Sequence, residues 1–118
     1  MSTTSETTSD SALLSKQCIP CTVGAAPLPP AELRRLAQQL GDGWEVVQEH
    51  HLRRAWTFDD FAAALAFTNA VGGLAEAEGH HPDIYLAWGK VEITIWTHKI
   101  DGLTESDFIL AAKIDRLR

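Results

Sequence analysis

The chain has 118 residues, of which 10 are lysine or arginine and 16 are aspartate or glutamate, so its formal net charge is −6 at pH 7. This length suits one domain built around a single hydrophobic core. The negative charge, and the lack of any lysine- or arginine-rich cluster in the sequence, exclude binding to nucleic acid through the phosphate backbone.

The N-terminal segment predicts neither export nor membrane insertion. It lacks the basic and continuous apolar regions of a secretory signal, and no uncharged stretch reaches the roughly 18 apolar residues of a membrane span. We therefore expect a cytoplasmic protein. Residues 1–16 are dominated by serine and threonine, which predicts a flexible tail, with residues 17–118 forming a single domain.

Cys18 and Cys21 form a Cys-Ile-Pro-Cys segment within a proline-rich stretch, residues 17–30, that we expect to be an extended arm leading into a helix. A single C-x-x-C supplies at most half of a tetrahedral zinc site. The segment also does not open a helix after a strand, as a thioredoxin-like pair would. We interpret the two cysteines as structural or incidental, with a disulfide or redox role as the alternative.

The first half of the domain predicts a helix and then a hairpin. Residues 33–40 have the apolar spacing i, i+3, i+4, i+7 of an amphipathic helix, which Gly41 and Gly43 would end. Residues 44–49 and 51–58 are rich in β-branched and aromatic residues and hold no proline or glycine. These two segments favour the paired strands of a hairpin.

A long central helix is expected next. Thr57 with Asp60 resembles a capping box, and residues 58–78 have an alanine-rich helical composition. Gly72 and Gly73 lie inside this segment, where each glycine costs about 1 kcal/mol relative to alanine. We expect them to mark close packing of the helix.

Two further strands, residues 83–88 and 90–98, are predicted on either side of a tight turn near Gly89. The second strand alternates, so that half of its side chains should be buried. One face carries Val91, Ile93, Ile95 and Thr97, and the other carries Glu92, Thr94, Trp96 and His98.

The last segment, residues 104–118, predicts a helix because Thr104 and Asp107 form a cap pair and acidic residues occupy the first turn. The order helix, two strands, long helix, two strands, helix indicates an α+β domain, in which a four-stranded antiparallel sheet carries helices on one face. Such a sheet leaves its edges exposed, and pairing with a second copy of the chain would cover them.

Three histidines are expected to converge at one end of this sheet. If the second hairpin turn is centred on residues 89–90, His81 lies opposite His98. A shift of one residue still leaves His98 within about two residues of the pair formed by His80 and His81. Glu76, one helical turn before His80, could hold its ring by a hydrogen bond. Imidazoles titrate near neutral pH, so this cluster favours acid/base chemistry.

Two other interpretations of the cluster stay open. Three histidines could bind zinc, although no H-E-x-x-H motif is present, or they could be hydrogen-bonded structural groups at the rim of the sheet. His50 and His51 form a second pair at a predicted hairpin turn, with no third histidine expected to meet them. We interpret this second pair as solvated.

The four tryptophans divide into two pairs. Trp44 and Trp56 are expected in the core or on a sheet face. Trp88 and Trp96 could flank the histidine pocket or form a contact between copies of the chain.

The segment AEAEGHHPDIYLAWGKVEITIWTHKIDGLTESDFILAAKID resembles the pterin-4a-carbinolamine dehydratase family, and the likeness extends from about Cys18 to the C-terminus. The family signature is a glutamate four residues before His-His-Pro, a Thr-His at the end of a later strand, GLTE, and an aspartate in the last helix. The matching residues are Glu76, His80, His81, Pro82, Thr97, His98 and Asp107.

The resemblance implies an α+β fold that assembles into dimers or tetramers, and the dehydration of 4a-hydroxytetrahydropterin to quinonoid dihydropterin without a metal or organic cofactor. It also implies roles for the matching residues. His80 and His98 would be the acid/base pair, and His81 would bind or orient the substrate. Glu76 would position His80, and Asp107 would support the site from below.

The family resemblance also brings a second functional class. Gly79 stands where some relatives have an acidic residue. Some relatives with this fold are not enzymes: one is a dimerisation cofactor of a homeodomain transcription factor, and others act in RuBisCO assembly. The alternative function is therefore a non-catalytic binding or assembly factor.

Overall fold

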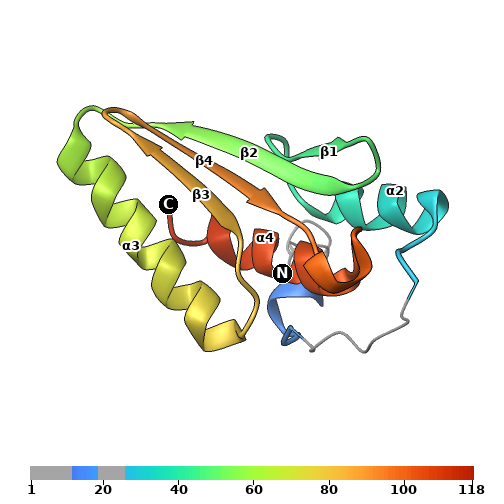
Figure 1. Cartoon of the computed structure of the whole chain (residues 1–118). Coiled ribbons are helices and arrows are strands. Elements are labelled where there is room, and N and C mark those ends of the chain that lie inside the picture. The colour runs from blue at the N-terminus through green and yellow to red at the C-terminus, as the bar shows by residue number, and fades with distance from the viewer. Residues whose placement is uncertain (1–11, 19–25) are drawn as a thin grey trace, which may run out of the picture.

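The computed structural model describes residues 12–18 and 26–118, and Figure 1 shows their arrangement. The helices and strands follow the predicted order, and the α+β class is confirmed. In chain order they are α2 (Pro30–Gln39), β1 (Glu45–Val47), β2 (His51–Thr57), α3 (Phe61–Glu78), β3 (Asp83–Ala87), β4 (Lys90–Ile95), the one-turn 3-10 helix η1 (His98–Ile100) and α4 (Glu105–Asp115).

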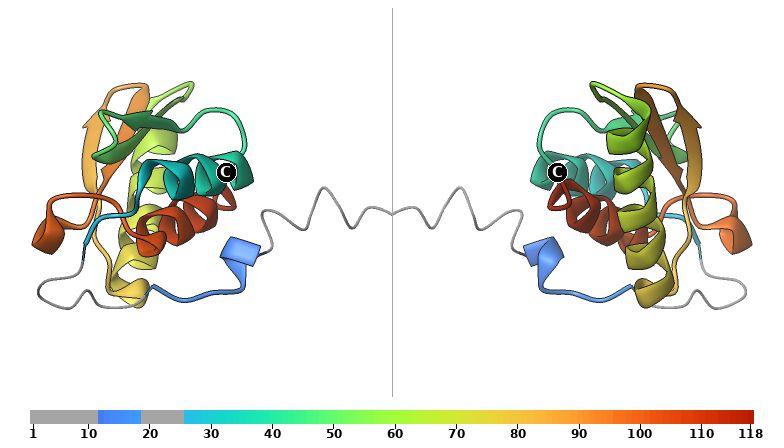
Figure 2. Two further views of the ribbon diagram at one scale, coloured as in Figure 1. Left: turned by 90° about the vertical axis from the view of Figure 1, so that its right-hand side faces the viewer. Right: turned by 90° about the vertical axis from the view of Figure 1, so that its left-hand side faces the viewer.

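The four strands form one antiparallel sheet in the order β1-β2-β4-β3, and the helices cover one of its faces (Figures 1 and 2). In β4 the side chains of Val91, Ile93 and Ile95 are completely buried on the helix side, while Glu92 and Thr94 are half-buried on the other face. The predicted alternation is confirmed. Burial of each such aliphatic side chain contributes about 1.5–3 kcal/mol to folding.

The turn between β3 and β4 lies one residue earlier than predicted. Ala87 pairs with Lys90, so the loop consists of Trp88 and Gly89. Gly89 lies in the loop in both registers, where it contacts the residue after β2: the Phe58 N–H donates to the Gly89 carbonyl at 2.8 Å, and a Cβ on Gly89 would meet the Phe58 carbonyl oxygen at 2.9 Å. This close approach requires a glycine at position 89.

The long helix α3 begins at Phe61, three residues after the predicted start. Its N-cap is Asp60, whose carboxylate accepts a hydrogen bond from the Ala63 N–H at 2.8 Å. Phe58 lies outside the helix and packs against the core. The helix ends at Gly79, which is left-handed at φ 66° and so turns the chain sharply.

Gly72 and Gly73 do not mark close packing within the described residues, contrary to our expectation. A Cβ added at either position would meet no atom within 4 Å. The two glycines therefore lie on an open side of α3. In the described part of the chain, neither this helix nor any other is long and apolar enough to cross a membrane.

The first strand of the first hairpin is shorter than the predicted residues 44–49. The strand β1 covers Glu45–Val47 only, because Gln48 and Glu49 adopt left-handed conformations, each with φ 54°. These two residues turn the chain into β2. His50 therefore lies at the end of a turn whose backbone is fixed, with its N–H donating to the Val47 carbonyl at 2.9 Å.

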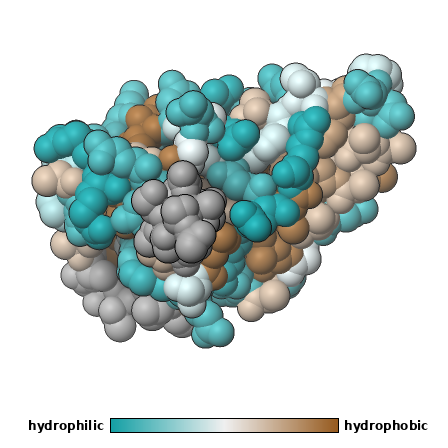
Figure 3. Space-filling view, turned by 180° about the vertical axis from the view of Figure 1, so that it is seen from behind, coloured by the Kyte–Doolittle hydropathy of each residue, from teal (hydrophilic) through white to brown (hydrophobic). Residues whose placement is uncertain are grey.

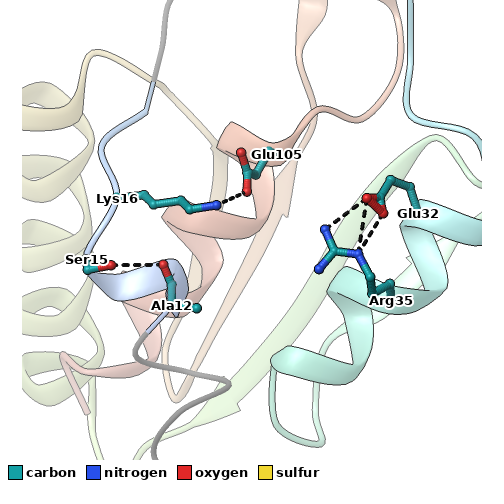
Figure 4. A network of polar contacts seen from close by, with 6 residues as sticks. All are labelled: Ala12, Ser15, Lys16, Glu32, Arg35 and Glu105. Carbon is teal, nitrogen blue, oxygen red and sulfur yellow. Dashed lines mark hydrogen bonds and ion pairs between the residues drawn. The ribbon is translucent and has the colours of Figure 1, made fainter.

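A short N-terminal arm, residues 12–18, packs against the body of the domain. Leu13 is only 1% exposed and belongs to the core. The predicted flexible tail, residues 1–16, therefore ends too late, because residues 12–16 lie in the folded part. The Lys16 ammonium donates to the Glu105 carboxylate at 2.6 Å at the start of α4 (Figure 4). The same view includes a bidentate Arg35–Glu32 pair on α2.

Cys18 lies at the end of this arm against α3 and α4. Its N–H donates to Glu78 at 3.2 Å, and its Sγ lies 3.5 Å from the Ser106 carbonyl oxygen. Burial, and then the Glu78 carboxylate, raise the pKa of the Cys18 thiol to about 12. Cys18 is therefore a structural thiol, whereas Cys21 lies outside the described residues.

We expect Leu13→Ala to lower the free energy of unfolding by about 2–5 kcal/mol, because the change leaves a cavity in a packed core. Urea titration would measure this loss. The control is Leu14→Ala, whose side chain is only half-buried and should cost less. Equal, small effects of the two variants would contradict the placement of the arm.

Candidate active site

A pocket of about 280 Å³ opens at the end of the sheet, where α3 passes into β3 and where β4 ends. The structure brings together the three histidines that the sequence predicts to converge, although the hairpin turn lies one residue earlier and the strand pairs differ from the predicted ones by two residues. The lining residues are Gly79, His80, His81, Trp96, Thr97, His98 and Lys99.

The buried carboxylate of Asp107 lies beneath the pocket. It is 0% exposed and accepts hydrogen bonds on both oxygens. The His80 Nε2–H donates to Oδ1 at 2.6 Å, while the Thr97 hydroxyl and the Thr104 N–H each donate to Oδ2 at 2.8 Å. The last bond is half of the predicted capping box at the start of α4. Three donors around one carboxylate suit its ionised form, which only accepts.

Glu76 pairs with His81 and not with His80, which corrects our expectation. The His81 Nε2 atom lies 2.9 Å from Glu76 Oε1, and both side chains are largely exposed. The expected i, i+4 pairing requires a continuous helix, but Gly79 turns the chain before the first histidine. His80 is thereby directed to Asp107, and His81 lies over the last turn of α3.

His98 differs from the other two histidines of the pocket because no described side chain forms a hydrogen bond with its ring. It lies on η1, is exposed, and packs edge-on against Trp96 with 4.3 Å between ring centroids and 89° between ring planes. Both ring nitrogens of His98 are therefore available to a ligand. The packing of Trp96 sets the orientation of the ring.

The other residues that the sequence predicts for the site differ in their distance from the pocket. Thr97 lines the pocket, Asp107 and Glu76 each hold a histidine from behind, and Pro82 is not among the lining residues. Lys99 was not predicted as a site residue, because a lone exposed lysine carries no signal in the sequence.

Of the tryptophans left with two interpretations, Trp96 flanks the pocket. Trp88 does not: it lies in the hairpin loop, at the other end of β3 and β4, and is 68% exposed. Trp56 is core, at 6% exposed, and Trp44 donates its indole N–H to Asp115 at 2.9 Å.

His50 and His51 are not simply solvated, which is a second correction. Both are half-buried, their Nδ1 atoms lie 3.0 Å apart, and their ring centroids lie 5.4 and 6.0 Å from that of Trp96. Burial, together with the positive charges of His50 and Arg53, lowers the pKa of His51. The pair is linked to His98 only through Trp96, which contacts all three rings. Sequence reasoning missed this contact because it depends on the pairing of β2 with β4.

Within residues 12–18 and 26–118, no three histidine, cysteine, aspartate or glutamate side chains are grouped so that they could hold a metal ion. The chemistry that the pocket residues themselves can supply is proton transfer by imidazoles, two of which are oriented by carboxylates.

The chain matches the model of the family described as pterin 4 alpha carbinolamine dehydratase over residues 26–117. It is 62% identical over 107 residues to a protein of Rubrobacter xylanophilus, covering 91% of this chain and 99% of that protein. It is 55% identical over 104 residues to a protein of Alkaliphilus metalliredigens, covering 88% and 94%. Both relatives are provisionally named pterin-4-alpha-carbinolamine dehydratase.

Two solved structures share the fold. The crystal structure of a transcriptional coactivator/pterin dehydratase from Brucella melitensis matches with a TM-score of 0.71 and 32% identity, covering 77% of this chain and 97% of that one. A pterin dehydratase-like protein identified as a RuBisCO assembly factor in the alpha-carboxysome matches with a TM-score of 0.55 and 27% identity, covering 64% and 88%.

The chain is an α+β protein with an open antiparallel sheet, and histidines line a pocket at one end of that sheet. Within that class, the chain belongs to the pterin 4 alpha carbinolamine dehydratase family.

We expect Asp107→Asn to lower the free energy of unfolding by about 1.5–3 kcal/mol, since a charged acceptor of buried hydrogen bonds is lost. Chemical denaturation would measure the loss. Glu105→Gln is the matched control: it makes the same change two residues earlier, in a partly exposed ion pair that contributes about 0–1 kcal/mol. A control that costs as much as Asp107→Asn would argue against the buried network.

Proposed function

We propose that this protein is a cytoplasmic 4a-hydroxytetrahydropterin dehydratase that acts in the recycling of tetrahydropterin. The observation that carries the proposal is the grouping of His80, His81 and His98 around one pocket, with two of them oriented by carboxylates and the third free to meet a ligand. Membership of the family supports the reaction class.

The proposed reaction converts the carbinolamine to quinonoid dihydropterin and water. The C4a–O bond breaks, its electron pair leaves with the oxygen, and one proton is added to that oxygen while one proton leaves the pterin ring. No electron is exchanged with another molecule. Hydroxide is a poor leaving group, so an imidazolium that protonates it, paired with an imidazole that accepts the ring proton, lowers the barrier.

The hydrogen bonds of His80 and His81, and the available ring nitrogens of His98, support a division of roles. His80 and His98 are the proposed acid/base pair. Asp107 compensates the positive charge of His80 when that ring holds a proton, and the Nε2 bond leaves Nδ1 available. His81, paired with the exposed Glu76, is the proposed substrate-orienting group. Thr97 supports Asp107 from the last residues of the sheet.

A second candidate function is a non-catalytic binding or assembly factor, such as a RuBisCO assembly factor or a transcription dimerisation cofactor. Two observations favour it: the likeness to a dehydratase-like protein identified as an assembly factor, and the large exposed aromatic side chains of Tyr85 and Trp88. This function predicts a stable partner complex that persists when all three pocket histidines are replaced.

We expect wild-type protein to accelerate the dehydration of freshly generated 4a-hydroxytetrahydropterin in a stopped-flow assay. His98→Ala, and the double change His80→Ala/His81→Ala, should each lower the rate by about 10²- to 10⁴-fold, because each removes a proton donor or acceptor.

The control for this assay is Lys90→Ala, an exposed change at the far end of β4 that should leave the rate unchanged. Circular dichroism would show that the histidine variants are folded. No acceleration by folded wild type would overturn the dehydratase proposal and favour the assembly factor.

The protein is also proposed to form a homodimer or homotetramer. The strand β3 is an open edge of the sheet, and Tyr85 on it is 60% exposed. Phe61 and Leu65 are exposed on α3, and Figure 3 shows apolar residues gathered along that side of the molecule. An open edge beside an apolar helix face fits a second copy of the chain.

Light scattering should therefore give a mass of two or four chains for the wild type. Tyr85→Lys should shift the protein toward the monomer, since a charge on the pairing edge opposes association. Glu45→Lys on the other edge strand, β1, should leave the mass unchanged. A monomeric wild type at micromolar concentration would contradict the proposal.

A further inference from the structure

The turn that carries His98 stands out from the body of the molecule, as Figure 2 shows for the segment after β4. Its base is fixed by backbone hydrogen bonds: the Thr97 N–H donates to the Gly102 carbonyl at 2.9 Å, and the two residues form an isolated bridge. Its outer end consists of η1 and of Asp101, which is left-handed at φ 52° and exposed. Within the outer end, the backbone bonds are local: the Ile100 N–H donates to the Thr97 carbonyl and the Asp101 N–H to the His98 carbonyl.

A histidine from the other hairpin holds that outer end. The His50 Nε2–H donates to Asp101 Oδ1 at 2.7 Å, across 51 residues of sequence. The two side chains are 31% and 86% exposed respectively. The backbone of His50 is itself anchored to Val47 in the turn between β1 and β2. The hydrogen bond thus connects Asp101 to the turn between β1 and β2.

Trp96 fills the space between the two histidines. Its ring lies 4.3 Å from that of His98 and 5.4 Å from that of His50, measured between centroids. The contacts form a closed ring that runs from His98 through Trp96 and His50 to Asp101, and back along three residues of chain to His98. These contacts link the position of the His98 imidazole to those of His50 and Asp101.

The contacts also link the rings of the second histidine pair. His50 donates from Nε2 to Asp101, and its Nδ1 lies 3.0 Å from Nδ1 of His51, so one of these two Nδ1 atoms donates and the other accepts. The lowered pKa of His51 favours the neutral ring that this arrangement needs.

We propose that His50 and Asp101 form a latch that positions His98 for catalysis. The proposal rests on the proposed dehydratase function and adds two positioning residues to it. His98 has no side-chain hydrogen bond of its own within the described residues, so its placement depends on the turn and on Trp96. A displacement of about 1 Å at a reacting group can cost about 10²-fold in rate.

The test compares His50→Ala, which removes the donor, with His50→Gln, which keeps a side-chain N–H. We expect kcat to fall by about ten- to a hundred-fold in His50→Ala with little change in KM, because substrate binding by the other pocket residues is kept. His50→Gln should restore much of the rate. Asp101→Asn, which tolerates the left-handed backbone, should weaken the latch, and its effect should not add to that of His50→Ala.

A second readout does not depend on the enzyme assay. In NMR spectra, the nuclear Overhauser contact between the His98 ring and the Trp96 indole should be lost in His50→Ala and retained in His50→Gln. Glu49→Gln is the matched control, since it removes one charge from the same turn and should leave both kcat and this contact unchanged.

Retention of the His98–Trp96 contact in His50→Ala would overturn the latch, as would an unchanged kcat in an active wild type. If the wild type proves inactive as a dehydratase, the function has failed separately, and the NMR contact alone decides whether His50 and Asp101 position His98. Thermal unfolding of each variant would show that the chain remains folded.

Discussion

The Asp107 carboxylate has no exposed surface, and an ionised group in that position is stable only if its oxygens are satisfied by donors. Those donors come from the end of α3, the end of β4 and the residue before α4, namely His80, Thr97 and Thr104. The hydrogen bonds that satisfy this one carboxylate therefore bring together the end of α3, the end of β4 and the start of α4. The pocket forms where they meet, so its position is a consequence of the electrostatics beneath it.

The left-handed backbone of Gly79 directs the side chains of the two adjacent histidines to different partners. Gly79 closes α3 in the left-handed region, and the chain then directs His80 inward and His81 outward. Behind this corner, the Lys113 ammonium donates to Glu78 at 2.6 Å. Burial raises the pKa of Glu78, but the hydrogen bonds from Lys113 and from the Cys18 N–H outweigh it and hold that pKa below its usual value. The end of α3 is thereby fixed to α4 and to the N-terminal arm.

Much of the fold could be predicted from local patterns. The order of elements, the alternation in β4 and the cap pair of Thr104 and Asp107 all follow from residues close together in sequence. The convergence of the three pocket histidines was predicted even though the hairpin turn was placed one residue too late and the strand pairs were wrong by two residues, because all three histidines lie near strand ends. These features needed no knowledge of distant contacts.

The errors share a physical cause, which is contact between segments remote in sequence. Glu76 was assigned to the wrong histidine because the effect of Gly79 on the chain direction was not considered. His50 was placed in solvent because the pairing of β2 with β4 cannot be read from either strand alone. The arm residue Leu13 was assigned to a tail because its burial depends on a core built by the rest of the chain.

Asp107 serves the helix cap and the pocket at once, whereas the ring of His98 forms no hydrogen bond with another side chain of the described residues. Natural selection for folding alone would preserve the aspartate in any descendant of this domain, even one that has lost its chemistry. Under the proposed function, selection for the reaction would preserve the exposed imidazole of His98, which folding does not require. The proposed function therefore makes the residue at the position of His98, and not the aspartate, the marker that would separate active from inactive relatives.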